Sequence, residues 1–180
     1  MLISYKHKLP GSYDFCNQGC SRNYRDGDLL KEHTFRFNTN HKRKYIVSVE
    51  EYRYNVFVLK FYLKDHRLSS KRFNILTKDF DGFKILSTLI AIVLYIYDKI
   101  NNDASFGFIG TPLLTENNTC NTKRFRVYQK LAKKHFSPDT FDHAVNIDNS
   151  SYLLLNKKVS DQDLKSNIED MFNRLYIGMS

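Results

Sequence analysis

The sequence predicts an α+β protein in which one mixed or antiparallel sheet packs against a buried central helix and two further helices. Two patterns favour this class. Between Phe83 and Ile100, 13 of 18 residues are apolar or aromatic and recur at three- and four-residue steps, which is helical spacing. Between Asn55 and Leu63, apolar side chains occupy both alternating faces, as in a strand at the middle of a sheet. A helix that is apolar on most of its surface must be covered on more than one side, so we expect it to lie on the sheet.

The N-terminal part of the chain is expected to be irregular before the sheet begins. Residues 1–32 are polar and are interrupted by proline and glycine, which favours loop with short helical turns and a short edge strand. Alternation then predicts strands at Thr34–Asn38, Tyr45–Glu50 and Asn55–Leu63, with a turn at Arg53–Asn55. A short strand at Phe73–Leu76 is expected to lead into the central helix, for which Asp79 or Asp81 would be the N-cap.

The second half of the chain alternates between strands and helices. A strand at Ser105–Gly110 is followed by a basic helix at Thr122–Phe136, two strands at Asp142–Ile147 and Ser151–Asn156, and a terminal helix within 160–177 capped by Ser160. With 180 residues in one series of elements, the chain is expected to form a single domain with its α/β core at 34–156.

Composition restricts the surroundings and partners of the protein. The start of the chain lacks the apolar run of a signal peptide, and its densest apolar run, Leu89–Tyr97, is too short for a bilayer, which needs about 20 residues. We therefore expect a cytoplasmic protein that does not span a membrane. The net charge of +9 favours a polyanion or nucleic acid as partner, or a protein partner with an acidic surface. Nothing in the sequence indicates the oligomeric state.

Three cysteines do not suggest a disulfide scaffold, but their spacing raises the question of zinc. Cys16, Cys20 and His33 have the gaps of a Cys-Cys-His-His finger. The next histidine, His41, follows after seven residues, where a finger has roughly three to five, and the residues between the two histidines alternate like a strand. We therefore expect no metal site, although a shortened finger with its fourth ligand elsewhere is an alternative.

The order of the expected elements resembles the GNAT superfamily of acyl-CoA-dependent N-acetyltransferases over roughly residues 34–156. Antiparallel strands, a central helix, a strand, a helix and a hairpin follow one another in that family. The resemblance implies acetyl-CoA as cofactor, with its pyrophosphate held at the N-terminus of the central helix. It implies cofactor contacts at Gly82, Lys84 and Asn121, and it places Tyr128 where the family's tyrosine protonates the leaving thiolate. The phrases FGFIG, NTKRFRVYQK and SSYLLLNK also resemble a family of small uncharacterised bacterial proteins, which implies no activity.

The cofactor loop departs from the family pattern. The chain reads Lys78-Asp79-Phe80-Asp81-Gly82-Phe83, which retains one glycine and places two aspartates where a pyrophosphate would be repelled. We therefore expect weak binding of acetyl-CoA or none. Glu50, Glu51 and Glu116 are candidate bases for activating an amine, and the alternative for each is a solvated surface acid. Tyr128 shares a helical face with apolar residues, so its alternative role is packing in the core.

The basic helix carries the strongest signal for an interaction. Six Lys or Arg fall within thirteen residues and would form an anion-binding or nucleic-acid surface, namely Lys123, Arg124, Arg126, Lys130, Lys133 and Lys134. The chain has no helix-turn-helix pattern, RNA-recognition signature or Walker loop. Two classes of function follow: a GNAT-like acyltransferase or its degenerate, non-catalytic relative, and a basic nucleic-acid- or protein-binding module without catalysis.

Overall fold

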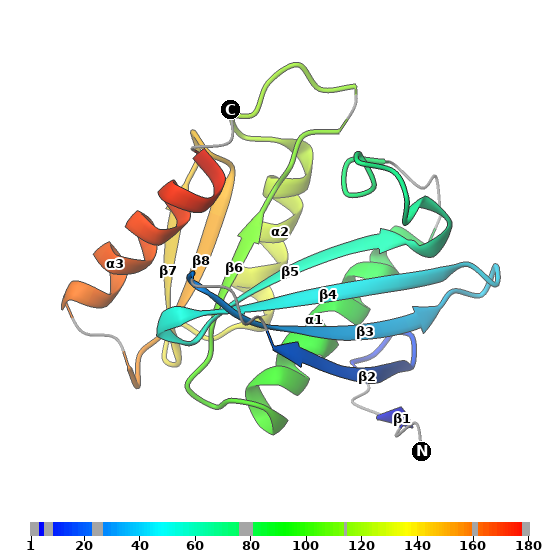
Figure 1. Ribbon diagram of the computed structural model, residues 1–180, viewed down its shortest axis with the longest axis horizontal. Coiled ribbons are helices and arrows are strands. Elements are labelled where there is room, and N and C mark those ends of the chain that lie inside the picture. The colour runs from blue at the N-terminus through cyan, green and yellow to red at the C-terminus, as the bar shows by residue number, and fades with distance from the viewer. Residues whose placement is uncertain are drawn as a thin grey trace.

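The computed structural model confirms the α+β class. It describes residues 4–5, 9–22, 27–75, 81–113, 115–159 and 162–177. Within these ranges, eight strands form one mixed sheet in the order β1-β2-β3-β4-β5-β6-β8-β7, and three α-helices pack on it (Figure 1). The strands are β1 (Ser4–Tyr5), β2 (Phe15–Arg22), β3 (Leu29–Asn38), β4 (Lys44–Tyr52), β5 (Val56–Leu63), β6 (Ser105–Ile109), β7 (Phe141–Asn146) and β8 (Ser151–Asn156). The α-helices are α1 (Gly82–Lys99), α2 (Lys123–His135) and α3 (Gln162–Phe172), and the last runs into a π-helical turn at Asn173–Ile177.

Strands β2 to β5 pair antiparallel in chain order and form a meander. Tyr52 of β4 pairs with Val56 of β5 across a tight turn, as expected for Arg53–Asn55. Tyr54 and Asn55 both have positive φ there, at 62° and 56°. Alternate residues of these strands point to the two faces of the sheet, so Phe35 and Val47 are fully buried on one face while their neighbours lie on the other.

Two segments differ from the sequence prediction. Within the described part of residues 1–32, strand is more extensive than expected, because β2 takes up eight residues and β3 already begins at Leu29. The polar residues of β2 are compatible with a strand near the sheet edge, where only Phe15 is buried in the core. The strand expected at Phe73–Leu76 does not form over its described part, since residues 71–74 are turns in which Phe73 packs on Tyr62. Leu76 and Asp79 lie outside the described residues.

The central helix is confirmed. α1 spans one face of the sheet, and Ile92, Val93 and Ile96 are completely buried. Burying one such side chain contributes about 1.5–3 kcal/mol. Asp81 precedes the helix as expected, but its side chain makes no cap hydrogen bond to the helix and instead accepts one from the Tyr13 hydroxyl at 2.5 Å.

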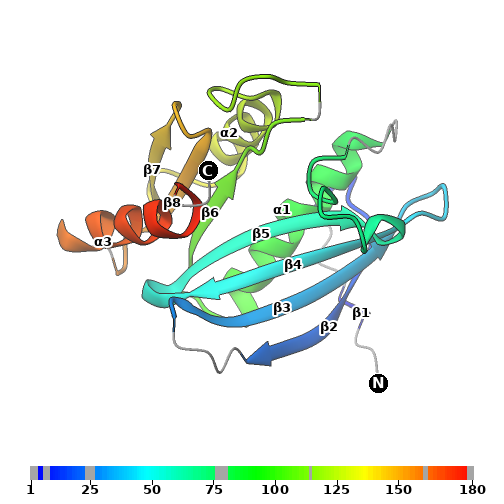
Figure 2. The ribbon, with the colours of Figure 1, turned by 45° about the horizontal axis from the view of Figure 1, so that its top comes forward.

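The helices divide between the two faces of the sheet (Figure 2). α1 and α2 share one core with the residues of β3 to β6 that face them. α3 covers the opposite face with Leu164, Ile168 and Met171, which pack against β5 and β8. Over β2 to β4, this second face carries no helix in the described structure. In the described residues, no helix combines the length and apolarity needed to cross a membrane.

Candidate functional site

The parallel strands β5 and β6 diverge and leave a wedge between them. They pair only from Val56 with Ser105 to Val58 with Gly107, and beyond this point the two strands separate (Figures 1 and 2). α1 begins at the wide end of the wedge, and the first part of α2 lies beside β6. The resemblance places an acyl thioester in this region of the fold, so the contents of the wedge decide whether the expected cofactor fits.

On the helix side, the wedge is filled by packed side chains. Its cavity has a volume of about 30 Å³, enough for one or two water molecules. Tyr128 of α2 lines this cavity, and its ring lies 6.4 Å from the ring of Phe108. Desolvation raises the pKa of the Tyr128 phenol, and the nearby Arg124 lowers it by a smaller amount. The phenol is therefore protonated at neutral pH, and Tyr128 is half-buried in the place where the resemblance puts a proton donor.

The outer end of the wedge is crossed by residues 71–75, and Arg124 holds them in place. Nη1 of Arg124 donates to the carbonyl oxygen of Phe73 and to Oγ1 of Thr111, the latter at 3.2 Å, and Nη2 donates to the carbonyl oxygen of Ile75 at 3.4 Å. Asn74 adds a hydrogen bond to the carbonyl oxygen of Pro112 at 3.1 Å. Arg124 is consequently half-buried and connects the β5–α1 segment to the β6–α2 loop. The prediction that Arg124 belongs to an exposed cationic surface is wrong for this reason.

The three residues expected to hold a cofactor have other roles in the structure. Gly82 is the first residue of α1, and the ammonium group of Lys84 lies 4.4 Å from the centre of the Tyr13 ring. The carboxylate of Asp81 accepts a hydrogen bond from the hydroxyl of the same Tyr13. Asn121 is tied to the β7–β8 turn, because its N–H donates to the carbonyl oxygen of Ile147 at 3.0 Å. Residues 78–80 of the expected loop lie outside the described residues.

The three candidate bases are all engaged by other groups. Glu51 is not a solvated acid, because it is buried and contacts Nε2 of His33 at 2.8 Å and Nζ of Lys31 at 3.0 Å. Glu50 lies on the open face of the sheet, where it contacts Lys60 at 2.6 Å and accepts a hydrogen bond from the Tyr52 hydroxyl at 2.7 Å.

Glu116 supports the start of α2. It accepts hydrogen bonds from the N–H groups of Leu113 and Lys123, both at 2.9 Å, and these bonds are the main reason that its pKa is lowered. A carboxylate with a lowered pKa is a poor general base.

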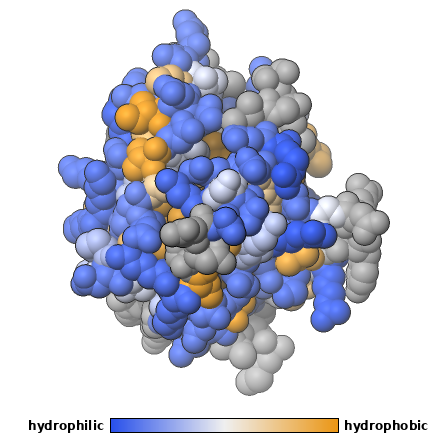
Figure 3. Space-filling view, turned by 90° about the vertical axis from the view of Figure 1, so that its left-hand side faces the viewer, coloured by the Kyte–Doolittle hydropathy of each residue, from blue (hydrophilic) through white to orange (hydrophobic). Residues whose placement is uncertain are grey.

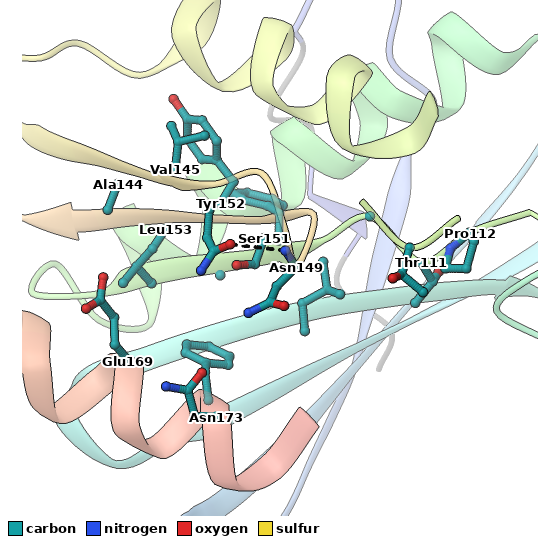
Figure 4. Close-up of a pocket in the computed structure, with 17 residues that line it drawn as sticks. Thr111, Pro112, Ala144, Val145, Asn149, Ser151, Tyr152, Leu153, Glu169 and Asn173 are labelled. Carbon is teal, nitrogen blue, oxygen red and sulfur yellow. Dashed lines mark hydrogen bonds between the residues drawn. The ribbon is translucent and has the colours of Figure 1, made fainter. Parts of the chain in front are cut away.

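A groove lies on the other face of the sheet, under α3. It has a volume of about 480 Å³ and lies between β6, β7, β8 and α3 (Figure 4), and we call it the α3 groove. Its apolar lining includes Ile109, Leu153 and Phe172, and its polar side chains include Asn146, Asn149, Glu169 and Asn173. Glu169 rises from α3 toward Ala144 and Leu153 (Figure 4). The surface on the side of α3 and β7 is otherwise mainly hydrophilic, and its hydrophobic residues gather in small patches (Figure 3).

Two glycines in the phrase FGFIG shape this region, and the sequence analysis assigned them no role. A Cβ atom on Gly107 would lie 2.8 Å from Cζ of Phe172, so glycine lets the α3 residue approach the sheet. A Cβ on Gly110 would lie 2.6 Å from the backbone nitrogen of Phe125, so glycine lets β6 end against the first turn of α2. The carbonyl oxygen of Gly110 accepts a hydrogen bond from Oγ1 of Thr122, the N-cap of α2, at 2.5 Å. In the sequence, the two glycines of FGFIG were the feature from which these close contacts could have been predicted.

The outer side of α2 bears five of the six expected cations. Lys123, Arg126, Lys130, Lys133 and Lys134 are exposed. The aromatic residues between them face inward, since Phe125 is buried and Tyr128 packs on Phe108, so they are not free to stack on bases. The exposed side of α2 therefore presents cations that could contact phosphate groups.

The residues considered for zinc lie on β2, on β3 and in the β3–β4 turn, and Cys20 is the strand partner of His33. Cys16 and Cys20 lie on β2, His33 contacts Glu51, and His41 is in the β3–β4 turn, 3.8 Å from the Asp81 carboxylate. In the part of the chain that the structure describes, no group of three or more His, Cys, Asp or Glu residues is placed to hold a metal ion.

Comparisons with known proteins found no match among family models, curated proteins or solved structures.

Proposed function

We propose that this chain is a non-catalytic relative of the GNAT acyltransferases, and that it binds a small amine in the α3 groove. The order of elements supports the relationship: antiparallel strands, α1, β6, α2 and the β7–β8 strand pair follow one another as the resemblance implies. The α3 groove is the observation on which the proposed binding activity rests.

The wedge between β5 and β6 does not fit acetyl-CoA. Its cavity of about 30 Å³ is too small for a thioester chain, and residues 71–75 cross its outer end. Asp81 adds a negative charge beside the first turn of α1, where a pyrophosphate would have to bind. We derive no acyl transfer for this chain, and Tyr128 serves packing rather than proton transfer.

The α3 groove has the size and lining of a small-molecule site. Its volume of about 480 Å³ falls within the range of roughly 300–1,000 Å³ that is usual for ligand pockets, and apolar walls with a few polar groups are typical of them. None of its described lining residues is basic, although the chain carries a net charge of +9. Glu169 is the one carboxylate in that lining. An apolar body with a positively charged amine therefore complements the groove.

The first test is a calorimetric titration with acetyl-CoA and with coenzyme A. We expect no binding up to millimolar ligand, both for the wild type and for Tyr128→Phe. Micromolar binding of acetyl-CoA that is lost in Gly82→Trp would refute the non-catalytic part of the proposal and restore the acyltransferase alternative.

The second test uses two ligands of nearly the same shape and opposite charge, 2-phenylethylamine and 3-phenylpropanoate. We expect saturable chemical-shift changes with the amine at residues of β8 and α3, and none there with the acid. Glu169→Gln should remove this preference, because it removes the carboxylate and keeps the side-chain size. Asp170→Asn is the matched control, since Asp170 is exposed on the same helix and does not line the groove. An equal response to both ligands, or a preference that survives Glu169→Gln, would overturn the amine assignment.

A further inference from the structure

A second groove lies on the same face of the sheet as α3, over the strands that carry no helix. It has a volume of about 500 Å³, and we call it the open-face groove. Its lining comprises Gln18, Gly19, Cys20, Ser21, Thr34, Arg36, Lys44, Ile46 and Lys64. Arg36 stands between Phe35 and Phe37 on β3, which are both buried against the α1 side, so Arg36 points to the opposite face.

Strand register brings the three cations of this groove together. Tyr45 pairs with Leu63, so Lys44 and Lys64 occupy neighbouring positions at one end of β4 and β5. Arg36 pairs with Ile46, which places it two residues from Lys44 on the adjacent strand. Within the described ranges, none of these three cations makes a salt bridge with an acidic side chain.

The acidic residues of this face are occupied elsewhere on it. Glu32 accepts a hydrogen bond from Oγ of Ser48 at 2.7 Å, and Glu50 is bound to Lys60 and Tyr52. Positive charge therefore accumulates at the end of the sheet that carries the β3–β4 turn, where Lys42 and Arg43 add two further cations. Like charges placed side by side on a sheet destabilise it, so this arrangement favours an anion that binds between them.

The form of the groove indicates the class of anion. Ile46 is the one apolar aliphatic side chain in the described lining, and the others offer ammonium, guanidinium, hydroxyl, thiol or amide groups. Neighbouring strands lie about 4.8 Å apart, so cations on β3, on β4 and at the end of β5 extend over roughly 10 Å. That span exceeds a single phosphate group and matches a chain of them.

We propose that the open-face groove binds the phosphate backbone of a single-stranded nucleic acid through Arg36, Lys44 and Lys64. The hydroxyl groups of Ser21 and Thr34 supply further donors to phosphate oxygens. This assignment is independent of the amine in the α3 groove, and it moves the nucleic-acid surface from α2 to the sheet.

The test compares two double variants of equal charge. Lys44→Gln with Lys64→Gln, and Lys130→Gln with Lys134→Gln on α2, each lower the net charge from +9 to +7, since two lysines are neutralised in each. Binding of a fluorescent, mixed-sequence, single-stranded DNA of twelve nucleotides is followed by anisotropy across a salt series. We expect the groove variant to bind at least about tenfold more weakly at low salt. The slope of log K against log salt should be less negative by about 1.4, because two phosphate contacts are lost and each contributes about 0.7 on a single strand.

The α2 variant should change affinity less than about twofold, and both variants should keep the circular dichroism spectrum of the wild type. An equal loss in both variants would show that net charge alone causes binding and would overturn the proposal, as would absence of binding at low salt. Displacement of the DNA by micromolar pyrophosphate would also overturn it, because the occupant would then be a small anion.

Discussion

The close contacts of three glycines predict a graded series of stabilities for single Gly→Ala variants. None of Gly82, Gly107 and Gly110 has the positive φ that alanine would resist, so the space around each Cβ decides the outcome. At Gly82, no atom lies within 4 Å of the added Cβ. At Gly107, the nearest atom is the end of the Phe172 ring at 2.8 Å, which can move. At Gly110, the nearest atoms belong to Phe125, whose backbone nitrogen lies at 2.6 Å and whose Cα lies at 2.7 Å.

The expected magnitudes follow from which neighbour can move. Gly110→Ala must displace the first turn of α2 from β6, so it should reach the upper end of the range for overpacking, about 3 kcal/mol. For a chain of this size, that corresponds to a fall in Tm of roughly 6–12 °C. Gly107→Ala should cost about 1 kcal/mol as Phe172 shifts, or roughly 2–4 °C. Gly82→Ala should raise the stability by about 0.5 kcal/mol, because alanine restricts the unfolded chain and favours a helix.

Thermal unfolding followed by circular dichroism, with denaturant unfolding as a second measurement, checks this order. Gly82→Ala is the control for the general effect of replacing glycine. If Gly110→Ala melted within about 2 °C of the wild type, β6 and α2 could not lie in the close contact described here. If Gly107→Ala were the more damaging of the two, Phe172 would be more rigidly held than its position at the end of α3 indicates.

Three other perturbations test separate parts of the structure. Leu89→Ala should lower the free energy of unfolding by about 2–5 kcal/mol in denaturant titrations, because Leu89 of α1 is buried against the sheet. An unchanged midpoint would contradict the burial of the central helix. Lys44→Gln should raise the stability by about 0.2–1 kcal/mol while it weakens oligonucleotide binding, and a loss of stability would mean that Lys44 has a stabilising partner. Glu116→Gln should lower Tm at pH 7. The pKa of Glu116 is lowered from its ordinary 4.5, so its contribution is present above that value and is lost as the pH falls through the folded-state pKa. The difference in Tm should therefore shrink as the pH is lowered from 4.5 through the folded-state pKa, and a difference that does not shrink at acidic pH would not come from the charge.

The parts of the fold that depend on local pattern were predictable from the sequence. The spacing of apolar residues in α1 and the alternation in β5 are properties of short segments, and the observed bounds agree closely with the expected ones. β2 was missed because a strand near the edge of a sheet buries few side chains, so its sequence alternates weakly. Phe73 and Ile75 alternate with the polar Asn74 as in a strand, yet Phe73 buries its ring against Tyr62 in a turn.

The candidate sites depend on contacts that no local pattern encodes. The sequence predicts Arg124 as one of six surface cations. Its hydrogen-bond partners Phe73 and Ile75 are 51 and 49 residues away in the chain, so a local pattern cannot reveal them. Glu51 reads as a surface acid, and only the pairing of β3 with β4 brings Lys31 and His33 to it. The cationic cluster of the open-face groove likewise combines Arg36 of β3, Lys44 of β4 and Lys64, which directly follows β5, and the register of these strands could not be derived before the strands were known.

The position of both proposed sites on one face follows from the handedness of the chain connections. The β5–α1–β6 crossover joins two adjacent parallel strands, and the β6–α2–β7 crossover passes over β8 to another parallel strand in the same direction across the sheet. Right-handed crossovers in one direction place both helices on the same side. That side becomes the main core, and both proposed grooves lie on the opposite face, where α3 covers part of the sheet and leaves the rest open. The two grooves are then separated by Lys60, Glu50 and Tyr52, and Tyr52 reaches Phe172 in the α3 groove with ring centres 6.5 Å apart.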